Sequence, residues 1–135
     1  MAVRVRVLAS DQPLLEGEAD FLTFRGADGD LGVLPQHAPL LTWLKPGEVM
    51  VRQGEGERYV FLEGGFLEVL PELVTVVAER GQLSTTIGLE AAEAELRAAQ
   101  ERATRDPESP AAIHLLEVAQ ARVTAAGLQR RRERD

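Results

Sequence analysis

The amino-acid composition changes abruptly near residue 85, and this change restricts the fold more than any other feature. Every aromatic side chain, and most of the glycines and prolines, lies before that point. Residues 85–135 are instead rich in Ala, Glu, Gln, Arg and Leu, which are strong helix formers. A chain of 135 residues is long enough for one domain with an appendage. We therefore expect a β-rich domain over residues 1–84 and a helical domain over residues 85–135.

The first part has the pattern of short strands separated by tight turns. Val3, Val5 and Val7 alternate with Arg4 and Arg6, which predicts a half-buried strand. Three more regions read as a short strand or a hairpin, and Gly64-Gly65 reads as a tight turn or bulge. These regions are residues 21–24, residues 49–52 with 59–63, and residues 66–70 with 74–78. Short strands at this spacing predict a small antiparallel β-sandwich or flattened barrel.

The second part predicts an antiparallel hairpin of two helices. The segment Arg105–Pro110 interrupts the helical pattern, and Ser109 followed by Pro110 is a good N-cap and first-turn pair for a second helix. Each helix carries one narrow apolar stripe, mostly alanine in the first. The stripes are Leu89, Ala92, Leu96, Ala99 and Ala103, then Ile113, Leu116, Val123 and Ala126 or Gly127. Because alanine buries little area, we expect a weakly packed hairpin that is able to detach.

Composition and spacing argue against several classes of protein. The chain has no cysteine and a net charge of −7, so thiolate chemistry is excluded and nucleic acid is not expected as a partner. No run approaches the roughly 20 apolar residues of a membrane span, so direct membrane insertion is not expected. His37 and His114 lie in different halves, with no nucleophile motif or second histidine nearby. Asp28 and Asp30 lack the remaining ligands of a Ca²⁺ loop.

These residues therefore predict no catalytic site and no metal site, and they favour a binding or regulatory subunit over an enzyme. One alternative is a free-standing β-sandwich that binds a ligand under a helical cap. A small hydrolase is a third reading, with neither a nucleophile nor a metal cluster to support it.

One long segment resembles a known family. Residues 29–47, GDLGVLPQHAPLLTWLKPG, resemble the signature of the epsilon subunit of bacterial F-type ATP synthases, which is equivalent to the mitochondrial delta subunit. The segments Phe61–Val69 and Val74–Ala78 and the Ala-rich helices follow in the family's order, so the resemblance covers nearly the whole chain.

The resemblance implies a fold and a role. The fold is an N-terminal β-sandwich followed by a C-terminal helical hairpin. The role is that of a non-catalytic subunit in the rotating central stalk, peripheral to the cytoplasmic face of the bacterial inner membrane. Its implied partners are the gamma subunit, the ring of c subunits and, when the hairpin extends, the alpha/beta catalytic head. The subunit helps to couple proton translocation to ATP synthesis, and the extended hairpin inhibits ATP hydrolysis.

The resemblance also implies contact residues. An acidic side chain at Asp30 is expected to pair with arginine on the c ring, which sets register more than affinity. Whether His37 makes a contact or only shapes the turn stays open. The implied c-ring contacts are Asp28, Gly29, Asp30, Leu31 and His37. The implied gamma contacts are Pro39, Leu40 and Leu41. The implied regulatory arginines of the hairpin are Arg97, Arg102, Arg105 and Arg122.

The first helix departs from a motif through which some relatives bind ATP. That motif has Ile or Leu, then Asp, two variable residues, Arg and Ala, and the best match here begins at Leu89 and ends at Ala94. Glu90 keeps the acid, but Glu93 replaces the arginine. A second carboxylate repels a triphosphate that arginine would neutralise. We therefore expect weak or absent ATP binding, and no cofactor.

Overall fold

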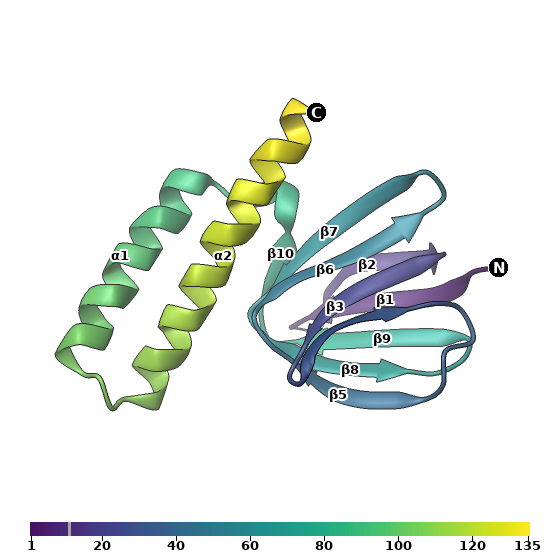
Figure 1. Cartoon of the computed structure of the whole chain (residues 1–135), viewed down its shortest axis with the longest axis horizontal. Helices are drawn as coiled ribbons and strands as arrows, with labels where there is room; N and C mark the ends of the chain where they lie inside the picture. The colour runs from purple at the N-terminus through teal and green to yellow at the C-terminus, as the bar shows by residue number, and fades with distance from the viewer. Residues whose placement is uncertain (11) are drawn as a thin grey trace. The chain divides into compact units, whose positions relative to one another are not determined.

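The computed structural model describes residues 1–10 and 12–135, which form two units (Figure 1). The first unit, Met1–Leu83, contains ten strands in one sheet, and the second, Ser84–Asp135, contains a short 3₁₀ turn and two helices. The predicted fold class, a β-sandwich followed by a helical hairpin, is confirmed.

The ten strands are short and follow one another closely along the chain. They are β1 (Val3–Ala9), β2 (Gln12–Ala19), β3 (Phe21–Gly26), β4 (Gly29–Val33), β5 (Leu40–Leu44), β6 (Gly47–Gln53), β7 (Gly56–Leu62), β8 (Gly65–Val69), β9 (Leu73–Ala78) and β10 (Gly81–Leu83). Both predicted hairpins are present, as β6–β7 and β8–β9.

The strand order is β10-β7-β6-β3-β5-β8-β9-β1-β2, and β4 pairs with β3 beside this path. All of these pairs are antiparallel except β1 with β9, which is parallel. The prediction of an antiparallel sandwich is wrong for this pair alone. β1 enters the sheet between its hairpin partner β2 and the distant strand β9, so a connection across the sandwich, and not a hairpin turn, sets its direction relative to β9.

The core of the first unit is built by the inward positions of alternating strands. In β1 the three predicted valines, Val3, Val5 and Val7, are buried, whereas Arg4 and Arg6 are exposed. Val5 and Val7 lie opposite Val74 and Val76 of β9, which are also buried. The largest fully buried side chains of this core are Leu22, Leu62 and Leu67. Burial of such branched side chains stabilises the sandwich by about 1.5–3 kcal/mol each.

Four strands were not predicted from the sequence, each for a physical reason. β4 (GDLGV) begins with glycine and aspartate, which are typical of a turn. β2 buries only Leu15 and Ala19, so its alternation of apolar and polar residues is too weak to predict a strand. β5 has apolar side chains on both faces, which hides the period of two. β10 has three residues, too few for a periodic signal.

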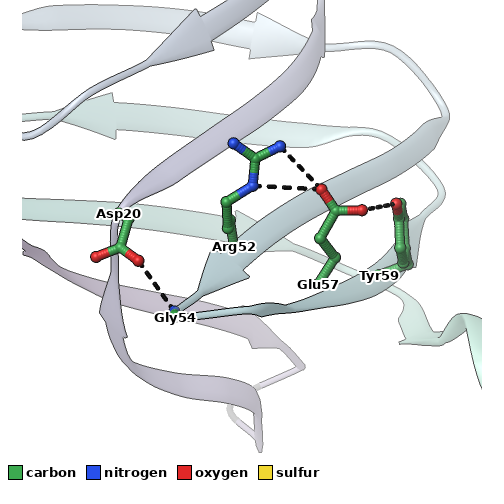
Figure 2. Close-up of polar contacts among 5 residues, drawn as sticks. All are labelled: Asp20, Arg52, Gly54, Glu57 and Tyr59. Atoms are coloured by element: carbon green, nitrogen blue, oxygen red, sulfur yellow. Dashed lines mark hydrogen bonds and ion pairs between the residues drawn. The ribbon is translucent and has the colours of Figure 1, made fainter.

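The tip of the β6–β7 hairpin is bound to the corner between β2 and β3 (Figure 2). The backbone N–H of Gly54 donates to the Asp20 carboxylate at 2.9 Å, and the Gln53 amide donates to the carbonyl oxygen of Glu18 at 3.1 Å. Because each bond connects residues more than thirty positions apart, the two bonds fix the hairpin on the sheet and not merely its own turn.

A polar chain continues along the outer face of the same hairpin (Figure 2). Arg52 donates to one Glu57 oxygen from Nε at 3.3 Å and from Nη2 at 3.0 Å, and the Tyr59 hydroxyl donates to the other oxygen at 2.7 Å. The Arg52 guanidinium also lies 5.3 Å from the ring centroid of Phe21 on β3, within cation–π range. These contacts hold β3, β6 and β7 in one register.

The second unit is a pair of packed helices, α1 (Leu89–Arg105) and α2 (Pro110–Arg134), after the 3₁₀ turn Ser84–Thr86. The predicted cap is confirmed, because the Ser109 hydroxyl accepts a hydrogen bond from the N–H of Ala112 at 3.1 Å. Among the described residues, neither helix is long and apolar enough to cross a membrane.

The stripe predicted on the first helix is correct in position, since Ala92 and Ala99 are buried. The prediction for Ile113 on the second helix is wrong, because its side chain is 52% exposed. The neighbouring Ala112 is buried in its place, while Ala126 is buried as predicted and Leu116 and Val123 are half-buried.

Replacing Gly65 by alanine is expected to destabilise the sandwich strongly. Gly65 has a φ of +157°, and a Cβ there meets the carbonyl oxygen of Val77 at 2.7 Å. We expect a loss of about 2–4 kcal/mol in the free energy of unfolding, measured by denaturant titration. Gly54 is the matched control, because it also has a positive φ (+64°) but open space at its Cβ. Gly54→Ala should cost only about 1 kcal/mol. Equal costs for the two variants would contradict the steric explanation.

Candidate functional site: an exposed apolar row on the sandwich

Four large apolar side chains form one continuous row across the outer face of the first unit. Trp43 of β5 lies opposite Phe66 of β8, Phe66 lies opposite Val77 of β9, and Val77 lies opposite Leu8 of β1. Directly opposed residues share a face of the sheet, so the row crosses four strands. We call these four residues the apolar row.

The apolar row is accessible and partly preorganised. Trp43 is 68% exposed and Val77 is 50% exposed, whereas Phe66 and Leu8 are half-buried. The rings of Trp43 and Phe66 pack edge to face, with centroids 4.9 Å apart and an interplanar angle of 71°. This geometry is favourable for aromatic pairs, so Phe66 restricts the orientation of Trp43 before any partner binds.

A more polar row borders the apolar row on the same face. It runs from Leu41 through Glu68 and Thr75 to Arg6. Arg6 donates from Nε to the Glu16 carboxylate at 3.3 Å, with both side chains about half exposed. An apolar centre beside a polar rim is the usual layout of a protein–protein interface.

The structure separates the three residues implied to contact gamma. Leu41 is 62% exposed and lies on the outer face, two residues from Trp43. Leu40 is half-buried and packs against the sandwich core. Pro39 is exposed and precedes β5. Only Leu41 and Pro39 therefore present accessible side chains.

The residues implied to contact the c ring lie on the β3–β4 hairpin. Asp28 is in the turn, whereas Gly29, Asp30 and Leu31 belong to β4 and not to a loop. Both carboxylates are exposed, but Leu31 packs against the core.

The fifth of these residues, His37, lies in a separate turn. Its backbone N–H donates to the carbonyl oxygen of Leu34 at 3.2 Å, and its Nδ1 lies 2.7 Å from the carbonyl oxygen of Ala38. The preceding residue, Gln36, has a φ of +64°, and its backbone N–H donates to the carbonyl oxygen of Pro71 at 2.9 Å. These local bonds agree with a role in shaping the turn.

Sequence reasoning missed Trp43 and Val77 as surface residues. The available signal was that β5, LLTWL, has four apolar residues in five, and that β9 ends with three consecutive apolar residues, Val-Val-Ala. A strand that is apolar on both faces is either buried on both or carries an exposed patch.

The four predicted regulatory arginines of the hairpin differ in their surroundings. Arg97, Arg102 and Arg105 of α1 are exposed. Arg122 of α2 has only 13% of its side chain exposed, and its Nε donates to the Glu95 carboxylate of α1 at 3.1 Å. Arg122 therefore links the two helices.

The predicted degenerate nucleotide motif lies at the start of α1. Leu89 is half-buried, whereas Glu90, Glu93 and Ala94 are exposed. Positions 90, 93 and 97 share one helix face, so two carboxylates adjoin one guanidinium there. The charge balance of this face is unfavourable to a triphosphate.

A family model described as the ATP synthase Delta/Epsilon chain, beta-sandwich domain, matches residues 2–83. The chain is 39% identical over 135 residues to the ATP synthase epsilon chain of Laribacter hongkongensis, with 96% of each chain covered. It is 37% identical to the corresponding chain of Alkalilimnicola ehrlichii, covering 98% of this chain and 96% of that one. Over 102 residues it is 41% identical to the chain of Acidithiobacillus ferridurans, covering 76% and 72%.

Solved structures show the same fold at lower identity. A chain of the Euglena gracilis mitochondrial ATP synthase assembly matches with a TM-score of 0.78 and 22% identity, covering 94% of this chain and 81% of that one. A chain of the Tetrahymena thermophila central stalk and c ring matches with a TM-score of 0.54 and 12% identity, covering 64% and 70%.

The Glu95–Arg122 pair is expected to stabilise the packing of α1 on α2. A double-mutant cycle with Glu95→Gln and Arg122→Gln should give a coupling energy of about 0.5–1 kcal/mol in thermal unfolding at low salt. The matched control is Arg6–Glu16, whose two side chains are both about half exposed. Its coupling should be smaller, and a larger value there would contradict the importance of burial.

Proposed function

The chain belongs to the family of ATP synthase delta and epsilon chains, and we propose that it works in the central stalk by joining the gamma subunit to the c ring. It is a non-catalytic subunit of that enzyme. The observation that carries the proposal is the apolar row, which gives a non-catalytic β-sandwich a surface suited to permanent assembly. As a stalk subunit, it is held at the cytoplasmic face of the membrane by its partners.

We assign the apolar row to the gamma subunit. A stable interface needs a central cluster of buried aromatic or aliphatic side chains, and Trp43 is the residue of the row best suited to be its anchor. Leu41 and Pro39 extend the same region toward the start of β5. Docking there removes the largest exposed apolar side chains of the sheet from water, which a subunit in a lasting complex requires.

We assign the β3–β4 hairpin to the c ring. Asp28 and Asp30 place two exposed carboxylates within three residues, and residues 1–84 carry a net charge of −6. Such a surface attracts arginines on a polar loop, so the carboxylates set position and register. Together, the two contacts let the sandwich pass rotation between the ring and gamma, and so couple proton flow to ATP synthesis.

We propose that the hairpin regulates ATP hydrolysis. Its helices bury mostly alanines among the described residues, and the partly buried ion pair between Glu95 and Arg122 links them. Two arrangements of so weak an interface lie within a few kcal/mol of each other. In an extended arrangement, Arg97, Arg102 and Arg105 supply positive charge toward acidic surfaces of the alpha/beta head.

Replacing the anchor of the apolar row should weaken binding to gamma. We expect Trp43→Ala to raise the dissociation constant about 30- to 1000-fold, measured by calorimetry with the gamma subunit of the same organism. Ile113→Ala is the matched control, since Ile113 is an exposed apolar residue of α2 outside the row. Trp43 is the only tryptophan, so its fluorescence should shift to the blue on binding. Unchanged affinity for Trp43→Ala would remove the row from the interface.

Deleting residues 107–135 tests the regulatory role of the hairpin. The truncated chain keeps the whole sandwich, so it should still assemble with gamma and the c ring. ATP hydrolysis by the assembled complex should rise, because the segment that extends toward the head is gone. Co-purification with gamma is the control for assembly. If the truncated complex assembles and hydrolyses ATP at the original rate, the inhibitory role is wrong while the stalk role stands.

A further inference from the structure

One strand of the sandwich has a free edge. Along the strand path every strand between β7 and β1 has a neighbour on each side, but β4 pairs only with β3 among the described residues. Within residues 1–10 and 12–135, none of the loop and turn backbone hydrogen bonds involves β4. An unpaired edge presents N–H and C=O groups to any extended chain that reaches it.

The register identifies which backbone groups face outward. Gly26 and Gly29 flank the two-residue turn of the β3–β4 hairpin, where the flanking residues form a hydrogen-bonded pair. Because hydrogen-bonded and non-bonded pairs alternate, Phe24 with Leu31 is the next bonded pair. The N–H and C=O groups of Asp30 and Gly32 therefore point away from β3.

The side chains leave this edge open. Gly29, Asp30 and Gly32 are all exposed. A Cβ at Gly29 would meet nothing within 4 Å, so the space beside it is empty. At Gly32 a Cβ would lie 3.0 Å from the Phe21 ring, which explains why a glycine occupies this position. This contact does not cover the backbone groups of the edge.

The other free edges differ from that of β4. On β2, Pro13 has no N–H to offer, and the carbonyl oxygen of Glu18 accepts a hydrogen bond from the Gln53 side chain. β10 is only three residues long. β2 also carries two exposed carboxylates, but that of Glu16 already pairs with Arg6. Among the described edges, β4 therefore best combines open backbone groups with available carboxylates, those of Asp28 and Asp30.

We propose that β4 binds a short extended segment of the c-ring loop by strand addition, with a cationic side chain of that segment paired to Asp30. This inference rests on the proposed stalk function, and it adds main-chain pairing to the carboxylate contact. Asp30 and Gly32 lie roughly 6.6 Å apart along the strand, so a stretch of three residues reaches both. The backbone bonds fix the segment in position, and Asp30 selects a positively charged one.

Hydrogen exchange tests the proposal directly on the wild-type chain. The amide exchange rates of Asp30 and Gly32 should be fast in the free subunit and about tenfold or more slower in the complete ATP synthase. The amide of Leu31, which already pairs with Phe24, should be slow in both. Fast exchange at Asp30 and Gly32 in a complete complex overturns the proposal. Asp30 would then act only as a charged side chain that prevents another strand from pairing with this edge.

Two further samples identify the occupant. Protection that appears in the complex with gamma alone, without the c ring, assigns the edge to gamma and overturns the assignment made here. Protection that appears in the free subunit only at high concentration assigns it to a second copy of this chain. Failure of the wild-type chain to assemble would instead contradict the stalk function, so the two failures are distinguishable.

Two substitutions at one position separate the backbone from the side chain. Asp30→Ala removes the carboxylate and keeps the N–H, whereas Asp30→Pro removes both. In binding of the gamma complex to the c ring, Asp30→Ala should weaken affinity several-fold, and Asp30→Pro about tenfold further. Because no hydrogen bond among the described residues uses this N–H, both variants should melt near the wild type. Equal affinities for the two variants show that only the carboxylate acts, which overturns strand addition. If the proline variant fails to fold, hydrogen exchange of the wild-type chain is the test of strand addition.

Discussion

The parallel pairing of β1 with β9 is the constraint on which the first unit depends. It joins residues about seventy positions apart, Val5 with Val74 and Val7 with Val76, and buries all four valines. The same register places Leu8 beside Val77 on the outer face, so one pairing completes both the core and the apolar row. Such distant contacts carry a large loop-closure cost, which the buried β-branched side chains must offset.

Different kinds of side chain stabilise the interior of each unit. The sandwich interlocks Leu, Val and Phe side chains, and backbone pairing ties every strand to a neighbour. The hairpin buries mainly alanines, each of which removes little apolar area from water. In the proposed function, the sandwich transmits rotation and has to be stiff, whereas the hairpin changes its arrangement and has to be held weakly. The distribution of side-chain size between the units fits this division of roles.

The sequence predicted features that depend on neighbouring residues, but it did not predict which distant strands pair. Ser109 and Pro110 mark the start of α2 because capping depends on residues within one turn. The β6–β7 and β8–β9 hairpins were also visible, since each depends on its own turn. The parallel partner of β1 depends on a crossover that no local pattern encodes. Ile113 was misplaced because the buried side of α2 is mostly alanine, so the hydrophobic pattern favoured the larger isoleucine over its buried neighbour Ala112.

The candidate site was partly predictable for the same reason. The family signature located the β3–β4 hairpin and the start of β5, which are local segments. The apolar row appears only after β5, β8, β9 and β1 are aligned, because each strand contributes one side chain.

The row and the β4 edge also differ in chemistry. Burial of Trp43 and Val77 in the proposed gamma contact is non-directional and favours lasting attachment, whereas the backbone pairing proposed at β4 is directional and fixes register. The proposed role of an adaptor between gamma and the c ring needs both properties, attachment to one partner and alignment with the other, and the sandwich carries the two candidate surfaces on separate strands.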